Sequence, residues 1–368
     1  MSIRGTESGA RRKALWRALR DVLRWPSIAA AIEQEKPTLG EDIMTILTRR
    51  RALGYGAAGV AALGLPSIVR AQSQVVRIGL PTKTYYPTII AETALRQKLF
   101  DKEGIKAELT IYRGGAEGYE AMAAGAADVI LNSASSVAAG IKKGVMAKNV
   151  AGAALGYYGW HLVVKADSPI QDPKELAGKK VGITSAGSGT DILALWTQAD
   201  RKITFTRVPL GGGGLVPNLL SGNIDACVLY SPLTYKMFLD KTARSLIDFG
   251  AAVPANMTGA WMATDKFIKD KPQLLQKTLN ALYGGLAFLQ NPKNRAEAIK
   301  LIAEIDEIPP PIAEAELDGN IVKLSKDGEM QKDWMQRALD MGRMIGMTDL
   351  APVEDIYVTT FKPVPTMV

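Results

Sequence analysis

A strand, a turn of small residues and a helix follow one another at residues 181–196, and this unit constrains the fold most strongly. Residues 181–183 are apolar, residues 184–190 are rich in Ser, Thr and Gly, and an amphipathic helix follows. The N–H groups at a helix start lack intrahelical acceptors, and the helix dipole adds partial positive charge there. Glycine lets a ligand approach such a backbone closely. The simpler alternative is an ordinary connection in which Ser and Thr cap the helix.

The same unit recurs along the chain, which favours a binding role for its turns. Apolar strands are expected at residues 75–80, 104–112, 127–131, 160–164, 181–183, 203–208 and 225–230, and the chain from residue 272 onward is expected to be mainly helical. Strands that alternate with helices predict an α/β fold with parallel sheets covered on both faces. In such sheets ligands bind beyond the carboxyl ends of the strands.

Composition excludes several classes of protein. The chain has one cysteine, Cys227, and one histidine, His161, which rules out an internal disulfide, a cysteine metal cluster and a multi-histidine metal site. The net charge is +8, but residues 1–71 hold 12 Lys and Arg against 6 Asp and Glu, so residues 72–368 carry only +2. We therefore expect no metal, no cofactor and no nucleic-acid partner.

The N-terminal region has the features of an export signal. Three arginines at positions 49–51 precede an apolar, Gly- and Ala-rich segment, and Val69-Arg70-Ala71 fits the small-x-small cleavage pattern. The paired arginines predict a twin-arginine signal, with the mature chain starting at Gln72. An uncleaved membrane anchor is the alternative. Met44 is well placed as a start codon, so residues 1–43 are expected to reflect an overlong start; the sequence leaves their translation open.

Three motifs carry a family resemblance. They are Leu-Phe-Asp-Lys-Glu-Gly-Ile at residues 99–105 with residues 120–129, Asp-Pro-Lys-Glu-Leu-Ala-Gly-Lys-Lys-Val-Gly at residues 172–182, and Leu-Leu-Ser-Gly-Asn-Ile-Asp-Ala at residues 219–226. Together they resemble the periplasmic solute-binding proteins of ABC importers, in the branch that binds nitrate, aliphatic sulfonates, taurine and thiamine-pyrimidine precursors. The resemblance covers about residues 75–310. Family members often have Glu-Pro where this chain has Ser231-Pro232, so the ligand is left open.

The resemblance implies a two-lobe periplasmic-binding-protein fold of type II, with each lobe a mainly parallel sheet flanked by helices. Lobe 1 would comprise residues 72–160 and 257–368, and lobe 2 residues 161–256, with the ligand cleft between them. It also implies a non-enzymatic, monomeric periplasmic protein. Such a protein captures a small organic anion, such as a sulfonate, taurine or a carboxylate, and delivers this solute to an ABC permease with a cytoplasmic ATPase. A periplasmic sensor or adaptor is the alternative.

Candidate ligand-binding residues lie at the expected strand ends. The turn at residues 184–190 contributes backbone and hydroxyl contacts, lobe 1 contributes a facing glycine and two serines, and aromatic residues form walls. Arg113 is the candidate cation for a carboxylate or sulfonate, because a guanidinium binds such groups bidentately. The remaining candidates are Tyr85, Tyr86, Gly114, Ser135, Ser136, Trp160, Ser185, Gly187, Ser188, Gly189, Thr190 and Tyr230. Helix capping and core packing are the simpler alternatives.

An enzyme is the competing class. Thiamine-pyrimidine synthases share the expected fold and use their own histidine and cysteines. With only His161 and Cys227, this chain is poorly equipped for that chemistry. No catalytic residue is therefore predicted.

Overall fold

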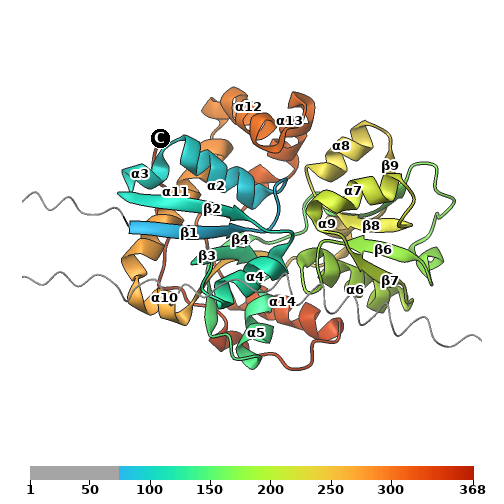
Figure 1. Ribbon diagram of the computed structural model, residues 1–368, viewed down its shortest axis with the longest axis horizontal. Helices are drawn as coiled ribbons and strands as arrows, with labels where there is room; N and C mark the ends of the chain where they lie inside the picture. The colour runs from blue at the N-terminus through green and yellow to red at the C-terminus, as the bar shows by residue number, and fades with distance from the viewer. Residues whose placement is uncertain (1–73) are drawn as a thin grey trace, which may run out of the picture. The chain divides into compact units, whose positions relative to one another are not determined.

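The computed structural model describes residues 74–368, which form two five-stranded sheets with flanking helices (Figure 1). The expected signal peptide and the start at Gln72 lie outside the described residues. Within the described part of the chain, no helix has both the length and the hydropathy that crossing a membrane requires.

The first sheet has the strand order β2-β1-β3-β10-β4. Its strands are β1 (Gln74–Leu80), β2 (Ile105–Ile111), β3 (Val129–Asn132), β4 (Ala147–Ala154) and β10 (Gly259–Thr264). Helices α2 (Tyr86–Arg96), α3 (Leu99–Lys102) and α11 (Pro272–Gln290) pack on one face, and α4 (Gly115–Ala123) and α5 (Ser135–Lys142) on the other (Figure 1). We call this sheet and its helices lobe 1.

The second sheet repeats this design with the order β7-β6-β8-β5-β9. Its strands are β5 (His161–Lys165), β6 (Lys180–Ile183), β7 (Thr206–Pro209), β8 (Ala226–Leu229) and β9 (Ala243–Asp248). Its helices are α6 (Gly189–Arg201), α7 (Gly212–Leu220), α8 (Leu233–Leu239) and the short α9 (Phe249–Ala252). We call this part lobe 2.

Each sheet is mainly parallel, as expected, but includes one strand that runs against the other four. In lobe 1, β1 pairs in parallel with β2 and β3, but β10 is antiparallel to both of its neighbours. In lobe 2, β6 is parallel to β7 and β8, and β5 is antiparallel to both of its neighbours. The reason is chain path: β5 and β10 each come directly from the other lobe and enter the sheet from the cleft side. They therefore run against strands whose carboxyl ends face the cleft.

The C-terminal helices contact both lobes. Helices α12 (Arg295–Asp306) and α13 (Pro310–Gly319) extend lobe 1, and α13 also packs against α8 of lobe 2. Helix α14 (Lys332–Met344) packs against α5 and α6, and its Met341 lies in the core of lobe 2. The expected lobe boundaries at residues 160/161 and 256/257 fall in the segments that connect the two sheets, and we retain them as a proposal.

Candidate functional site

A cavity that is partly open to solvent lies between the lobes at the carboxyl ends of the strands. The turns after β1, β2, β3, β6 and β8 contribute to it, together with the segment that joins β4 to β5. The lining residues are Pro81, Thr82, Tyr85, Tyr86, Gly114, Gly115, Leu131, Asn132, Ser133, Ala154, Gly156, Tyr157, Trp160, Thr184, Ser188, Gly189, Thr190, Tyr230, Thr258 and Asn320. Every one of them is uncharged.

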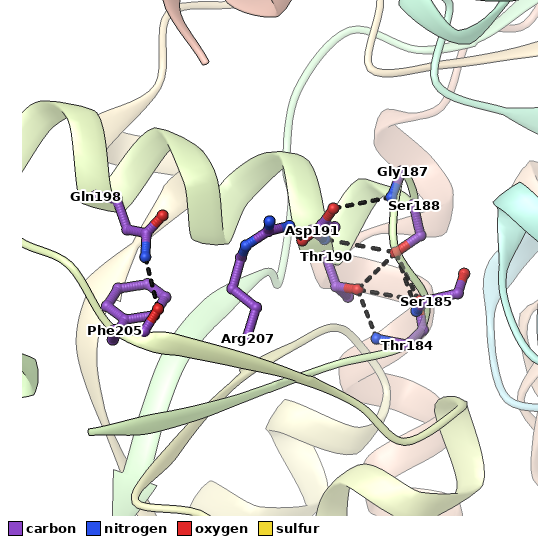
Figure 2. Close-up of polar contacts among 9 residues, drawn as sticks. All are labelled: Thr184, Ser185, Gly187, Ser188, Thr190, Asp191, Gln198, Phe205 and Arg207. Carbon is purple, nitrogen blue, oxygen red and sulfur yellow. Dashed lines mark hydrogen bonds and ion pairs between the residues drawn. The ribbon is translucent and has the colours of Figure 1, made fainter. Parts of the chain in front are cut away.

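The start of helix α6, whose polar contacts are drawn in Figure 2, contributes the lobe 2 side of the cavity. The hydroxyls of Thr184, Ser188 and Thr190 bond to one another at 2.8–2.9 Å, and Ser188 also caps the helix through the N–H of Asp191. These hydroxyls are buried, so their mutual bonds fix the shape of the turn. The backbone N–H groups of Gly189 and Thr190 are left without an acceptor in the described chain, as the first turn of a helix requires.

Asp191 is held away from the cavity. Its Oδ2 accepts a 2.8 Å hydrogen bond from the N–H of Gly187, and its Oδ1 forms an ion pair with Arg207 (Figure 2). The carboxylate therefore stabilises the turn and the helix start, where the dipole favours a negative charge. Because Arg207 compensates its charge, Asp191 leaves the helix start available to an anion.

The start of helix α4 forms the opposite side, in lobe 1. Gly114 lies directly against the α6 turn, since a Cβ atom at Gly114 would be 2.6 Å from Ser185 Oγ and 2.9 Å from Thr184 Oγ1. The adjacent Gly115 is fixed by Asn132, whose amide donates to the Gly115 carbonyl at 3.1 Å. The Gly212 N–H donates to the Arg113 carbonyl at 3.1 Å across the cleft. The lobes are thus closed around the cavity.

Aromatic rings line another side of the cavity. Tyr85 lies 5.6 Å from Trp160 and 5.1 Å from Tyr230, measured between ring centroids, and Trp160 lies 5.3 Å from Tyr230. Tyr157 packs edge-on to Trp160 at 5.7 Å. These spacings are those of stacked and edge-to-face pairs, so the rings form a continuous wall. The wall gives the cavity an apolar surface for the body of a ligand.

Three buried hydroxyls on the cavity wall have no hydrogen-bond partner among residues 74–368. They are Thr82 Oγ1, Tyr86 Oη and Tyr230 Oη. Burial raises the pKa of both tyrosines, so both phenols stay protonated and able to donate. Buried polar groups without partners are uncommon, and a bound ligand or water would satisfy these three.

Eight of the thirteen candidate residues line the cavity: Tyr85, Tyr86, Gly114, Trp160, Ser188, Gly189, Thr190 and Tyr230. Five do not. The Arg113 side chain is 81% exposed and pairs with Glu117 at 3.5 Å. Ser135 Oγ is buried against Ser133 Oγ, Ser136 lies in the first turn of α5, Ser185 lies beneath Gly114, and Gly187 is exposed.

Arg113 is displaced from the cavity for a local reason. Its backbone is used by both lobes, because its N–H donates to Glu117 Oε2 at 2.7 Å and its carbonyl accepts from Gly212. The side chain is thereby directed outward to Glu117. The expected arginine contact with an anion has no basis in this arrangement.

Several lining residues were not named as candidates, although their segments were expected to bind. Thr184 lies in the turn at residues 184–190, and Asn132 and Ser133 lie just beyond the strand expected at residues 127–131. Gly115 adjoins a residue that was predicted. Thr82 lies three residues before the predicted Tyr85, and Tyr157 lies three residues before the predicted Trp160. Asn320 and Thr258 come from distant segments that no local pattern connects to the cleft.

Neither candidate for covalent or acid–base chemistry lies on the cavity wall. Cys227 is fully buried in the core of lobe 2, which raises the pKa of its thiol. His161 Nδ1 is 2.9 Å from Ser245 Oγ, and its ring packs on Phe238. Burial lowers the pKa of His161, although Asp248 opposes this effect. In the described chain, no group of His, Cys, Asp and Glu is arranged to hold a metal ion.

Comparison with known proteins identifies relatives of this chain. A binding protein of Brucella abortus is 23% identical over 296 residues, which cover 77% of this chain and 90% of the relative. An aliphatic sulfonates-binding protein of Bacillus subtilis is 25% identical over 246 residues, which cover 66% of this chain and 73% of the relative. These relatives are binding proteins, not enzymes.

The fold matches solved structures of the same class. The alkanesulfonate-binding protein SsuA from Xanthomonas axonopodis, bound to MOPS, has a TM-score of 0.68 at 17% identity, with 78% of this chain and 99% of that chain covered. The α/β class and the resemblance found in the sequence are thereby confirmed.

The family described as NMT1/THI5 like matches residues 89–295, more than half of the chain. The chain belongs to the NMT1/THI5 like family.

Proposed function

We propose that this protein is the periplasmic solute-binding component of an ABC importer, and that it captures a small organic anion between its lobes. The observation that carries the proposal is the convergence of two helix starts, α4 and α6, on a cavity without charged side chains. The two helix starts bring N–H groups and partial positive charge to one place. No carboxylate of the lining opposes an anion there.

The anionic head group is assigned to the polar side of the cavity. The free N–H groups of Gly189 and Thr190 lie there, opposite Gly114 and Gly115 of the other lobe. Hydrogen bonds from neutral donors to a charged group are worth roughly 1.5–3 kcal/mol each, so a few of them hold an anion without a counter-ion. Because the donors come from both lobes, binding the head group favours the closed arrangement.

The body of the solute is assigned to the aromatic wall. Tyr85, Trp160 and Tyr230 offer contact surface for an alkyl chain or a ring. A sulfonate or carboxylate with an apolar body matches this division of the cavity into a polar side and an aromatic side. The Bacillus relative is named for aliphatic sulfonates, and the Xanthomonas protein holds MOPS, a sulfonate with a ring.

Delivery to a permease and export by the twin-arginine route belong to the same proposal. The paired arginines at positions 49–51 and the cleavage pattern ending at Ala71 supply the export signal. Replacing Arg49 and Arg50 by Lys should abolish export in a fractionation assay. N-terminal sequencing of the exported wild-type protein should read from Gln72, and a start elsewhere would reject the proposed cleavage site.

A thermal-shift screen tests the ligand class. Purified protein is heated with MOPS, hexanesulfonate, benzenesulfonate, taurine, benzoate or nitrate, and with uncharged pyrimidines as the contrasting class. A solute at a hundredfold excess over its Kd stabilises the folded state by about 2.7 kcal/mol, which raises the Tm by several degrees. A shift with sulfonates or carboxylates supports the proposal, whereas a shift with the uncharged compounds alone would reject it.

A further inference from the structure

Two buried carboxylates outside the cavity lining form no ion pair within residues 74–368. Asp306, in the last turn of α12, is 3% exposed, and Glu316, in α13, is fully buried. Both oxygens of Asp306 and Oε2 of Glu316 have no hydrogen-bond partner within the described chain. The C-terminal end of a helix also disfavours a negative charge at Asp306. Ionised carboxylates in such surroundings carry a large desolvation penalty.

The neighbouring charged and titratable groups do not neutralise this pair. Lys83, in the turn after β1, forms its ion pair with the exposed Glu307 at 2.5 Å. Lys323 lies over the ring of Tyr158, 5.2 Å from its centroid. From lobe 2, the phenol of Tyr230 lies near Asp306 and that of Tyr235 near Glu316, and both phenols stay protonated because burial raises their pKa values.

Burial and mutual repulsion therefore keep protons on the pair. Burial, together with the charge of Glu316, raises the pKa of Asp306 to about 8, although Lys83 opposes the shift. Burial raises the pKa of Glu316 to about 7, while hydrogen bonds with Ser231 and Asn320 act against the shift. The two groups titrate as one coupled pair near neutral pH.

Glu316 is connected to the cavity and to the other lobe through one side chain. Asn320 Nδ2 donates to Glu316 Oε1 at 2.7 Å and to Ser231 Oγ at 3.0 Å. Asn320 lines the cavity, while Ser231 follows β8 in lobe 2 and adjoins the lining residue Tyr230. We call Glu316, Asn320 and Ser231 the latch. It is a direct polar contact between the C-terminal helices and lobe 2.

We propose that the latch closes only while Asp306 and Glu316 retain protons, so that closure of the lobes takes up protons. In the closed form, Tyr230, Ser231 and Tyr235 of lobe 2 cover the acids. Opening would admit water, return their pKa values toward the ordinary range and release protons. By linkage, the closed form is favoured at low pH and loses its advantage as the pH rises toward 8. Glu316 is then a positioning residue that acts through Asn320.

The link from closure to solute retention rests on the proposed function, but closure itself is testable without a solute. Ala116 and Gly187 lie on opposite lobes, and a Cβ atom at Gly187 would be 3.9 Å from the Cβ of Ala116. This separation lies inside the range of about 3.5–4.5 Å that disulfides use. The buried Cys227 does not compete. The rate of disulfide formation in an Ala116→Cys/Gly187→Cys protein thus reports the closed population.

The experiment compares this rate from pH 6 to pH 9 in two backgrounds. The reference carries Asp306→Asn and Glu316→Gln, which cannot ionise, so the ratio of the two rates cancels thiol ionisation and backbone strain at Gly187. We expect the rate in the background that keeps Asp306 and Glu316, divided by the rate in the reference, to fall at least about tenfold across this range. The reason is that closure takes up at least one proton. A ratio independent of pH would overturn the proposal.

Two single variants separate a positioning role from a merely structural one. Glu316→Gln keeps an oxygen that accepts from Asn320 and leaves Asp306 as the one member of the pair that titrates. Its cross-linking should be fast at pH 6 and should fall less by pH 9 than in the protein that keeps Glu316. Glu316→Ala removes the acceptor and should slow cross-linking at every pH. If Glu316→Gln instead cross-links as slowly as Glu316→Ala throughout, the proton has no role and the proposal fails. A negative solute screen with an intact pH effect would reject the proposed function alone.

Discussion

The two lobes share one scaffold but present different chemistry to the cavity. In lobe 1, Asp128 Oδ2 accepts from the Arg77 N–H at 2.9 Å, and in lobe 2, Asp225 Oδ2 accepts from the Lys180 N–H at 2.8 Å. Each aspartate follows a helix-ending glycine, Gly125 or Gly222, with φ of +76° in both cases. The Gly-x-x-Asp sequences thus tie the start of each central parallel strand to the strand beside it. The scaffold is duplicated, and specificity is left to the turns.

The turns also exchange roles across the cleft. The α4 start in lobe 1 lies against Thr184 of lobe 2, and the α7 start in lobe 2 lies against Thr82 of lobe 1. At the first contact, the hydroxyls bond to one another beside a free helix start. At the second contact, the neighbours are Tyr230 and the aromatic wall. Equivalent positions therefore give a polar half and an aromatic half, which orients an asymmetric solute.

The largest expected effect concerns the C-terminal helices, which have no counterpart in lobe 2. Because the pKa of Asp306 is raised to about 8, its proton stabilises the folded state below the ordinary carboxyl pKa, and this contribution is lost as the pH rises through 8. The contribution of Asp306 to the free energy of unfolding should fall by roughly 5 kcal/mol from pH 4 to pH 8, and Asp306→Asn should remove this contribution. Urea unfolding at several pH values measures both, and parallel curves for the two proteins would contradict the prediction.

A methyl group added at Gly114 or at Gly212 should disrupt the contact that each glycine makes with the other lobe. A Cβ at Gly212 would lie 2.6 Å from Tyr230 Oη and 2.7 Å from Thr82 Cγ2, comparable with the contacts at Gly114. Gly114→Ala and Gly212→Ala should each weaken solute binding by about a hundredfold, near 2.7 kcal/mol, by holding the lobes apart. Calorimetric titration with a solute from the screen measures this loss. Gly213→Ala is the matched control, because a Cβ there meets open space.

The duplicated aspartates should differ in their contribution to stability. Asp128 also accepts hydrogen bonds from the Arg77 guanidinium at 2.6 and 3.0 Å. Asp225 instead accepts from the backbone N–H of Lys180. Asp128→Ala should cost about 2 kcal/mol and Asp225→Ala about 1 kcal/mol, because charge-assisted bonds are the stronger kind. Denaturant midpoints give the comparison, and equal losses would show that the guanidinium adds nothing.

The smallest effect is expected from a single phenol. Tyr230→Phe keeps the aromatic wall and removes a hydroxyl that has no hydrogen-bond partner within residues 74–368. Thermal stability without solute should change little, while solute affinity should fall a few-fold, by about 1 kcal/mol, if the hydroxyl contacts the solute. Unchanged affinity would restrict the solute to the polar half of the cavity.

Much of the fold was readable from the sequence because its repeats are local. Strand–turn–helix units predicted the α/β class, and the motifs at residues 99–129, 172–182 and 219–226 carried the family resemblance. The reversed direction of β5 and β10 was missed, because strand direction depends on chain path rather than on local pattern. The pattern also located the turn at residues 184–190 without showing which of its side chains face inward. Asn320 was beyond reach, since only tertiary packing brings α13 and its end to the cleft.

The position of β10 has a consequence for how the chain becomes organised. Lobe 2 is built from one uninterrupted stretch, whereas β10 must insert between β3 and β4 after lobe 2 has intervened. Contacts between segments so far apart in the sequence form late, because the entropy cost of closing the loop between them comes before the contacts stabilise the fold. During synthesis, lobe 1 therefore exposes the flanks of β3 and β4 until residues 259–264 arrive. A holding chaperone acting on the nascent chain would find its substrate at those two unpaired edges.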